Sequence, residues 1–149
     1  MNTATTPDYK HQRLLLFYKG DISALMLFAQ HQNGSVCFPE PLPTLSSALE
    51  PEEFQAQKIK LHPAPLLNHI LKQLELDNDL LKIEIDFSEQ IDTPDGIVTV
   101  HMARFMLLDP PHQLMLSRNC RLRTLPELRR LPPAELELLR RAYQRVMES

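Results

Sequence analysis

The stretch that decides the fold is residues 65–108, which read PLLNHILKQLELDNDLLKIEIDFSEQIDTPDGIVTVHMARFMLL. Its first part repeats Leu and Ile at the spacing of an amphipathic helix, with Pro65 near the helix start. Apolar and charged residues then alternate from residue 81 to residue 87, which is typical of a half-buried strand. Thr93-Pro94-Asp95-Gly96 has turn chemistry throughout and leads into a longer apolar run. The stretch therefore predicts a helix over 65–76 and a hairpin of residues 80–87 with 97–108.

Two shorter apolar runs lie N-terminal to this stretch. Residues 14–18 are apolar without interruption, which indicates a strand buried on both faces, and residues 24–29 form a second run. Asn33-Gly34 follows, and this pair favours a hairpin turn because both residues tolerate positive φ. We therefore expect residues 36–38 to return as a strand beside the second run.

The remaining segments are a proline-rich connection and a helical C-terminal part. Six prolines punctuate residues 39–65, so we expect an ordered loop with at most a short helix within residues 50–60. Such a long connection inside a compact domain tends to carry function. Residues 125–130 predict one helical turn, and residues 133–147 predict a closing helix. The apolar face of that helix is expected to carry Leu136, Leu139, Tyr143 and Val146.

Length and composition fit a single α+β domain with a mixed sheet packed against helices. A chain of 149 residues with 43% apolar and 23% charged residues is close to the globular norm. Residues 1–12 lack an apolar period and are expected to form a flexible arm. The domain should then span residues 13–149, with residues 39–65 as an insertion. We also predict a homodimer, because a long strand offers an edge for pairing.

Three features favour a cytoplasmic protein with no membrane contact. No stretch approaches the roughly 18 apolar residues of a membrane span. Residues 1–12 lack the apolar core of a signal peptide. Cys37 and Cys120 lie far apart and form no CxxC pair, so buried thiols are favoured over a disulfide framework or a zinc site.

The net charge of −3 is unevenly spread along the chain. Residues 1–111 carry 8 Lys and Arg against 15 Asp and Glu, a balance of −7, whereas residues 112–149 carry 8 Arg against 4 Glu, a balance of +4. Guanidinium groups bind phosphate or carboxylate in a fork, so the Arg-rich segment favours an anionic partner. Pairing with the acidic part of the same chain is the alternative interpretation. We expect no nucleic-acid partner at this net charge.

Absent motifs exclude several classes of enzyme. The three glycines, Gly20, Gly34 and Gly96, each lie in a predicted turn, whereas a P-loop or Rossmann loop needs clustered glycines. Neither a GxSxG elbow nor an HExxH helix is present. No two of the six histidines are four residues apart on a helix, so we predict no metal site, and no motif implies a cofactor.

Taken together, the segments resemble a Nudix domain. In that family a helix reading Arg-Glu-apolar-x-Glu-Glu-x-Gly-apolar leads into a strand, a turn and another strand, as residues 66–105 do. Cys37-Phe38-Pro39 is similar to the aromatic-Leu-Pro-Gly-Gly entry of the family, and residues 125–147 fit its C-terminal end. The resemblance covers most of residues 13–147 and implies an α/β/α sandwich.

The acidic residues that make such a domain a hydrolase are absent. Aligned on the apolar positions, the Arg-Glu of the family falls on Asn68-His69, and its Glu-Glu pair falls on Lys72-Gln73. The family holds Mg²⁺ on these glutamates, and Mg²⁺ is a hard cation that needs carboxylate oxygens. The resemblance therefore implies a domain without catalytic residues or a bound metal. The alternative route to catalysis is a carboxylate from the connecting loop, supplied by Glu50, Glu52 or Glu53.

Three functions are consistent with this sequence. The leading one is a non-catalytic, Nudix-like binding or regulatory domain that recognises a small anionic ligand or a protein partner. The others are a divergent metal-dependent hydrolase of a phosphate-containing, nucleoside diphosphate-type substrate and an unrelated α+β protein-interaction module. In a Nudix-like fold the ligand cleft lies between the sheet and the helix of residues 65–76, so the candidate ligand-binding residues are His69, Lys72, Gln73 and Arg104. Lys72 would then hold an anion directly through charge-assisted hydrogen bonds. The other interpretation places His69 and Lys72 on the solvated face of an amphipathic helix.

Overall fold

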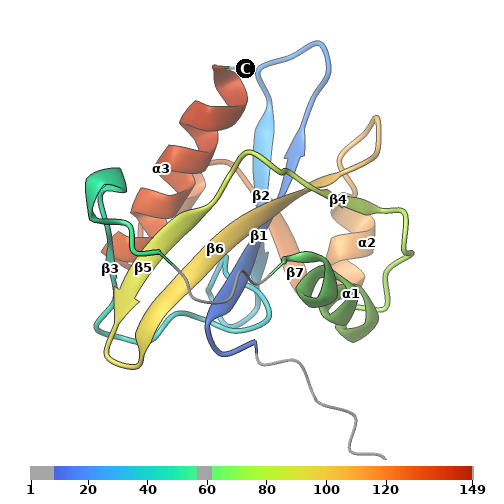
Figure 1. Cartoon of the computed structure of the whole chain (residues 1–149). Coiled ribbons are helices and arrows are strands. Elements are labelled where there is room, and N and C mark those ends of the chain that lie inside the picture. Colours follow the sequence, from blue (N-terminus) through green and yellow to red (C-terminus); the bar gives the residue numbers. More distant parts are fainter. Residues whose placement is uncertain (1–8, 57–61, 149) are drawn as a thin grey trace, which may run out of the picture.

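The apolar run near the N-terminus forms a central strand in the computed structural model, which describes residues 9–56 and 62–148 (Figure 1). This strand, β1 (Gln12–Lys19), is buried over nearly its whole length. It pairs in parallel with β6 (Gly96–Phe105) on one side and antiparallel with β2 (Met26–His31) on the other. The described residues form one α+β domain around this mixed, open sheet.

The other strands extend the sheet on both sides of this central group. The order of neighbouring strands is β3-β5-β6-β1-β2-β7, and β4 pairs with the C-terminal half of β6. All pairings other than that of β1 with β6 are antiparallel. The outer strands are β3 (Ser47–Ala48), β4 (Leu81–Ile83), β5 (Glu89–Thr93) and β7 (Cys120–Arg123).

Helices cover both faces of the sheet, so the elements form three layers (Figure 1). Because successive side chains of a strand point to opposite faces, Leu14 and Leu16 of β1 pack with the first two helices, and Leu15 and Phe17 pack with the third. We call these the α1 face and the α3 face. The helices are α1 (Ala64–Gln73), α2 (His112–Ser117) and α3 (Pro133–Met147), with single-turn 3-10 helices η1 (Pro51–Glu53) and η2 (Pro126–Leu128).

α1 confirms the helix predicted from the apolar spacing. Fully burying each of its apolar side chains stabilises the fold by roughly 1.5–3 kcal/mol. The helix ends at Gln73, three residues before the predicted end, because Glu75 adopts a left-handed φ of 52°. The N–H of Leu76 donates to the carbonyl of Leu71 (2.8 Å) and closes the last turn. Its buried residues are Leu66, Leu67, Ile70 and Leu71.

The predicted hairpin exists, but with a different first strand. The turn at Thr93–Gly96 is correct, and it joins β5, which the sequence analysis missed, to β6. The predicted strand over 80–87 is correct only for β4, because the chain leaves the sheet after Ile83 and the N–H of Phe87 donates to the carbonyl of Glu84. Ile85 is consequently 85% exposed, and β6 ends at Phe105, three residues before its predicted end.

The predicted returning strand over 36–38 is wrong. Gly34 adopts a φ of 93° in the expected turn, but the chain then leaves β2 and meets the sheet only at a single bridge between Phe38 and Leu14. On the side away from β1, the partner of β2 is β7, which comes some ninety residues later in the chain, after α2. Neither β7 nor α2 was predicted, because β7 contains alternating Arg residues and α2 has fewer than two turns.

The residue ranges predicted for the C-terminal helices are correct, but the predicted buried face of the closing helix is wrong. η2 lies within the predicted turn, and α3 spans the predicted residues. Its buried face is rotated from the predicted one, since Tyr143 is 37% exposed and Leu136 is half-buried. The buried residues are Ala134, Glu135, Leu138, Leu139 and Ala142. A charged residue, Glu135, therefore lies on the core side of this helix.

The proline-rich insertion is attached to the domain at its start by Arg13. The guanidinium of Arg13, whose side chain is 3% exposed, donates to the carbonyls of Glu40 (2.9 Å) and Pro41 (3.2 Å). Further along, β3 pairs with β5. Where a short helix was expected within residues 50–60, the described residues contain only the single turn η1, and residues 54–56 are not helical. Residues 57–61 of the insertion and residues 1–8 of the predicted arm lie outside the described residues. In the described part of the chain, no helix is long and apolar enough to cross a membrane.

Candidate functional site

The exposed side of α1 carries three of the four predicted ligand residues. Lys72 and Gln73 are exposed, and His69 is half-buried. The ring of Tyr9 lies over the imidazole of His69 with 4.5 Å between centroids, and the Tyr9 hydroxyl donates to the carbonyl of Pro65 (3.3 Å). Four hollows among the described residues are lined by other side chains, and none of these four borders His69, Lys72 or Gln73.

Arg104, the fourth predicted ligand residue, lies on the opposite face of the sheet. Met102 of β6 packs in the core of the α3 face, and Ala103 packs in the core of the α1 face. By this alternation the side chain of Arg104 lies on the α3 face. The space between the sheet and α1 is filled by core residues rather than by a cleft. The structure therefore does not bring the four residues together, and ligand binding by those on α1 stays a prediction.

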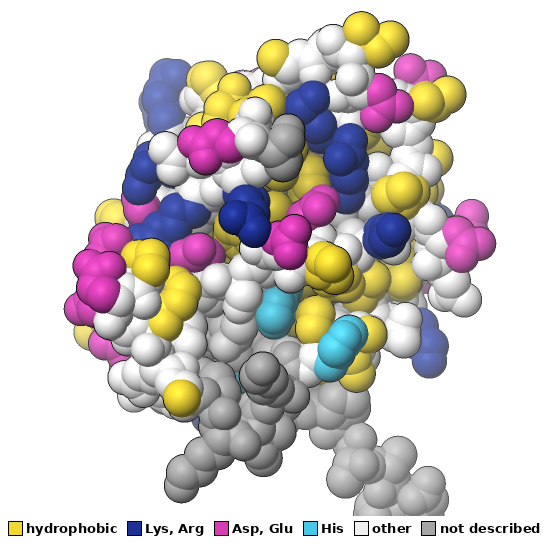
Figure 2. All heavy atoms as spheres, turned by 45° about the horizontal axis from the view of Figure 1, so that its top comes forward, with side chains coloured by type: hydrophobic (Ala, Val, Ile, Leu, Met, Phe, Trp, Pro, Cys, Tyr) yellow, Lys and Arg dark blue, Asp and Glu magenta, His cyan; other side chains and the backbone are white. Residues whose placement is uncertain are grey.

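Arg104 lines two adjoining hollows at one end of the sheet, which we call the end groove. The hollows have volumes of about 730 and 240 Å³ and share Asp21, Glu84, Asp86 and Arg104. The groove runs between the β1–β2 connection, the β4–β5 connection and the end of β6, and it reaches the last turn of α3. Figure 2 brings this end forward and shows Lys and Arg side chains interspersed with Asp and Glu around a hollow.

The basic groups of the end groove are bound mainly to backbone carbonyls. Arg104 donates to the carbonyl of Lys19 (3.2 Å), and its guanidinium lies 3.6 Å from the carboxylate of Asp21. The ammonium of Lys19 donates to the carbonyls of Gly20 (2.6 Å) and Ser23 (2.8 Å). Among the described residues, Glu84, Asp86 and Arg145 form no ion pair within 4 Å. Apart from the Arg104–Asp21 pair, charged groups of both signs therefore face the groove without an ion-pair partner among the described residues.

Exposed apolar side chains gather at the same end of the molecule. Of the nine large apolar residues that are exposed in the described chain, six belong to the segments that border the end groove. The Tyr18 hydroxyl donates to the carbonyl of Leu108 and holds the segment after β6 against β1. Because these side chains are exposed to water, they gain no stabilisation from burial, unlike the apolar side chains of the core. The six are Ile22, Leu25, Ile85, Met106, Leu107 and Leu108.

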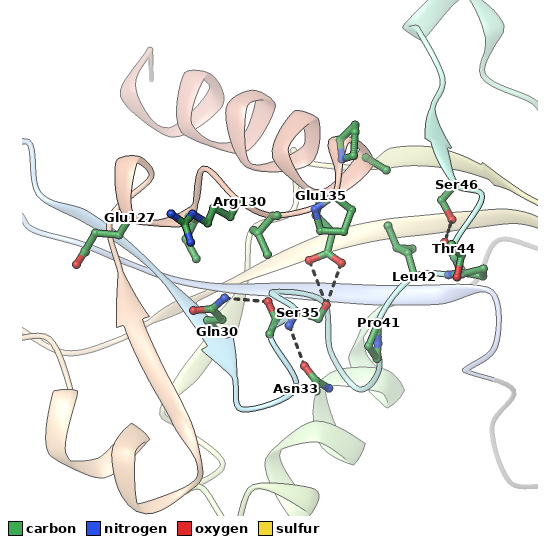
Figure 3. A pocket seen from close by; sticks show the side chains of 17 residues that line it. Gln30, Asn33, Ser35, Pro41, Leu42, Thr44, Ser46, Glu127, Arg130 and Glu135 are labelled. Carbon is green, nitrogen blue, oxygen red and sulfur yellow. Dashed lines mark hydrogen bonds between the residues drawn. The ribbon is translucent and has the colours of Figure 1, made fainter.

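A separate hollow of about 520 Å³ lies at the start of α3 and contains a buried carboxylate (Figure 3). Glu135 accepts hydrogen bonds from the hydroxyl of Ser35 (3.1 Å) and the N–H of Val36 (3.0 Å). Desolvation raises the pKa of Glu135, and burial raises the pKa of the neighbouring Cys37 thiol. The Ser35 hydroxyl also accepts from the N–H of Cys37 (3.0 Å). This cluster fastens the chain after β2 to α3.

Sequence reasoning found one residue of the end groove and missed the others. Glu84 and Asp86 were expected on the solvated face of the strand over 80–87, and Lys19 and Asp21 were expected in a turn, so nothing in the sequence marked these four residues as a site. The usable signal was the run Met106-Leu107-Leu108, which ends at Asp109-Pro110-Pro111 and was assigned to a strand. No group of three or more His, Cys, Asp or Glu residues that could hold a metal ion occurs in the described part of the chain.

Comparison with models of known protein families finds no family that matches this chain, and comparison with curated proteins finds no match. The Nudix resemblance therefore rests on the sequence pattern of residues 13–147 alone. Membership of that family stays a prediction.

Proposed function

We propose that this chain is a non-catalytic, Nudix-like binding domain that recognises a segment of a partner protein in the end groove. The observation that carries the proposal is that four exposed apolar side chains line the groove together with Arg104. They are Ile85, Met106, Leu107 and Leu108. Monomeric proteins rarely expose large contiguous apolar patches, and patches of this kind usually mark interaction sites. Apolar anchors surrounded by polar groups are also the usual composition of protein interfaces.

The charges of the groove define the kind of segment that fits. The lining contains four cations against three carboxylates, a balance of +1. A partner segment that carries charges of both signs, with one acidic residue in excess, would complement this lining. Apolar side chains of that segment would cover the exposed run after β6. The cations are Lys19, Lys82, Arg104 and Arg145, and the carboxylates are Asp21, Glu84 and Asp86.

The residues on α1 support a role without metal-dependent catalysis. At the positions where the Nudix family holds Mg²⁺ on glutamates, this helix carries the imidazole of His69, the ammonium of Lys72 and the amide of Gln73. An ammonium repels a divalent cation, and a neutral amide is a weak ligand for Mg²⁺. The stacking of Tyr9 on His69 also occupies part of this surface.

Selection from a random peptide library displayed on phage tests the proposal with defined probes. Peptides selected on the wild-type protein should bind in a fluorescence polarisation assay, with affinity reduced at least tenfold by Leu108→Asp and by Arg104→Ala. Leu45→Asp is the matched control, because Leu45 is 79% exposed, Leu108 is 81% exposed, and only Leu108 lines the groove. Peptides that bind all three variants as well as the wild type would contradict the proposal.

A second copy of this chain is the competing occupant of the groove. The homodimer predicted from the sequence would instead pair through the edge of the strand over 97–108, which β1, β4 and β5 cover. Light scattering of the wild type and of Leu108→Asp separates the two cases. A monomer mass for both proteins is expected if the groove serves a different partner. A dimer mass for the wild type with a monomer mass for Leu108→Asp would show that a second copy covers the groove, and would overturn the assignment to another protein.

A further inference from the structure

A hollow beside the edge strand β7 contains cations and polar groups but no carboxylate. Its volume is about 430 Å³, and it lies between the end of β2 and the segment Asn119–Arg123. Arg121 and Arg123 are its charged residues, and the remaining polar side chains are amides and one imidazole. This lining contrasts with the end groove, where cations and carboxylates are mixed. We call this recess the β7 hollow; its other polar residues are Gln30, His31, Gln32 and Asn119.

The two guanidinium groups lie on one face of the sheet, with Gln30 of β2 beside them. Arg121 and Arg123 are two residues apart on β7, so their side chains point the same way. Gln30 is the registered partner of Arg121, and its Oε1 accepts from Nε of Arg123 (2.7 Å). Nε2 of Gln30 donates to the carbonyl of Gly34 (2.8 Å), so both ends of this amide are held. The hydrogen bond to Gln30 fixes Arg123 through Nε. The terminal nitrogens of Arg123 form no hydrogen bond among the described residues and are therefore available for a ligand.

Three other arginines of the C-terminal segment, Arg118, Arg140 and Arg141, have partners within the chain, which supports the intramolecular interpretation for these three. Arg141 pairs with Glu89 (2.5 Å) and Glu137 (2.7 Å), and Arg118 donates to the carbonyl of Leu74 (2.7 Å). Among the described residues, no ion pair within 4 Å involves Arg121 or Arg123. Glu127 on η2 accepts from the backbone N–H and hydroxyl of Thr124, and Arg123 acts on this carboxylate only through its charge, as a minor cause of its lowered pKa.

Two like charges held on one face repel each other, and an anion between them would remove that repulsion. A monocarboxylate brings about one negative charge, whereas a phosphate monoester brings about −1.5 to −2 at neutral pH. The guanidinium fork also matches the oxygens of phosphate. A phosphate dianion therefore fits the charge of the hollow better than a single carboxylate does.

From this geometry we infer that the β7 hollow is a binding site for a phosphate dianion, held by Arg121 and Arg123 and organised by Gln30. The inference does not depend on the proposed function, because the hollow shares no residue with the end groove. Binding transfers no group and needs no metal. The ligand is either free inorganic phosphate or the terminal group of a phosphate monoester.

Titration of the ¹⁵N-labelled protein, followed by NMR, tests this site at constant ionic strength. Inorganic phosphate should shift the amide signals of residues 119–123 saturably, and acetate should not. Adenosine monophosphate in a third titration distinguishes the sources, since tighter binding than that of inorganic phosphate identifies an ester as the ligand. Arg121→Ala and Arg123→Ala should each weaken binding about tenfold, the loss expected for a charged hydrogen bond. Gln30→Ala should cause a smaller loss, because it keeps both charges and removes only the orientation of Arg123.

Arg129→Ala is the matched control, since Arg129 is an exposed arginine next to η2 that does not line the hollow. It should leave the phosphate titration unchanged. Signals of the double variant Arg121→Ala/Arg123→Ala that still shift as in the wild type would overturn the inference, as would equal binding of acetate and phosphate. The dispersion of the amide spectrum shows in the same experiment that each variant is folded.

Discussion

α1 and the end groove differ in how far the sequence pattern specifies them. The apolar period of α1 specifies which side chains are buried, and the opposite side of the helix borders none of the four hollows. The end groove is built where β1, β4 and β6 end, from residues with no period in common. Periodicity thus predicts the core of this domain, whereas its candidate recognition surface depends on what the periodic elements leave exposed at their ends.

The largest loss of stability should come from a substitution on the buried side of α1. Ile70→Ala removes a fully buried side chain from the core of the α1 face and should destabilise the protein by about 2–5 kcal/mol. Urea denaturation followed by circular dichroism measures this difference. A loss below about 1 kcal/mol would mean that α1 packs less tightly than described, and the contrast with the end groove would then fail.

Glu135 combines both cases, because its carboxylate lies on the buried face of the amphipathic helix α3 and also borders a hollow. Glu135→Ala leaves the N–H of Val36 and the hydroxyl of Ser35 without their acceptor, which should cost about 1–3 kcal/mol. Thermal and urea unfolding measure the loss. Ser35→Ala keeps the carboxylate and removes only the hydroxyl contact, so its effect should be smaller.

The pH dependence of this cluster has a defined sign. Desolvation raises the pKa of Glu135 in the folded protein above its ordinary value of 4.5, so the folded state binds this proton more tightly than the unfolded state. The contribution of Glu135 to stability is therefore largest below that ordinary value and is lost as pH rises through the folded pKa. The stability of the wild type relative to Glu135→Gln should fall as the pH rises above the ordinary value of 4.5. A relative stability that rises with pH above this value would contradict the assignment.

Arg104 tests whether the end groove contributes to the fold as well as to recognition. Its ion pair with Asp21 is long and partly exposed, so Arg104→Ala should cost no more than about 1 kcal/mol. Peptide binding in the groove should nevertheless fall at least tenfold. A stability loss as large as that of Ile70→Ala would assign Arg104 to the structure of the sheet end instead.

The smallest change in stability should come from a substitution on the exposed side of α1. Lys72→Glu reverses a charge on a solvated surface and should change stability by less than about 0.5 kcal/mol. It should alter neither peptide binding in the end groove nor the phosphate titration of the β7 hollow. Loss of anion binding in this variant would support the sequence-based prediction that His69, Lys72 and Gln73 form a ligand site.

The fold was predictable where one physical signal dominates. An uninterrupted apolar run predicted β1, and apolar residues at helical spacing predicted α1 and α3. β7 escaped prediction because its alternation of Arg with Cys and Leu resembles a loop when read without its partner β2. The strand predicted over 80–87 was too long because Ile85 continues the alternation although the chain has left the sheet.

The candidate site was less predictable, because it depends on which side of the sheet each residue faces. Arg104 was identified, but it was grouped with residues of α1 that lie across the sheet from it. The face of a strand residue becomes known only once the strand has been assigned to its helices. Asp21 and Glu84 lie in connections, and only the pairing of β1 with β6 brings these connections together.

The parallel pairing at the centre of the sheet has a consequence for the order of folding. Leu14 pairs with His101, 87 residues later in the chain, so the innermost contacts of the sheet close a very long loop. Domains dominated by such distant contacts fold slowly, because the entropy of loop closure must be overcome before the contacts form. During synthesis, β1 and β2 emerge early and can pair, but β1 keeps one unprotected edge until β6 leaves the ribosome. This nascent edge, rather than any surface of the finished domain, is where we expect a chaperone to act.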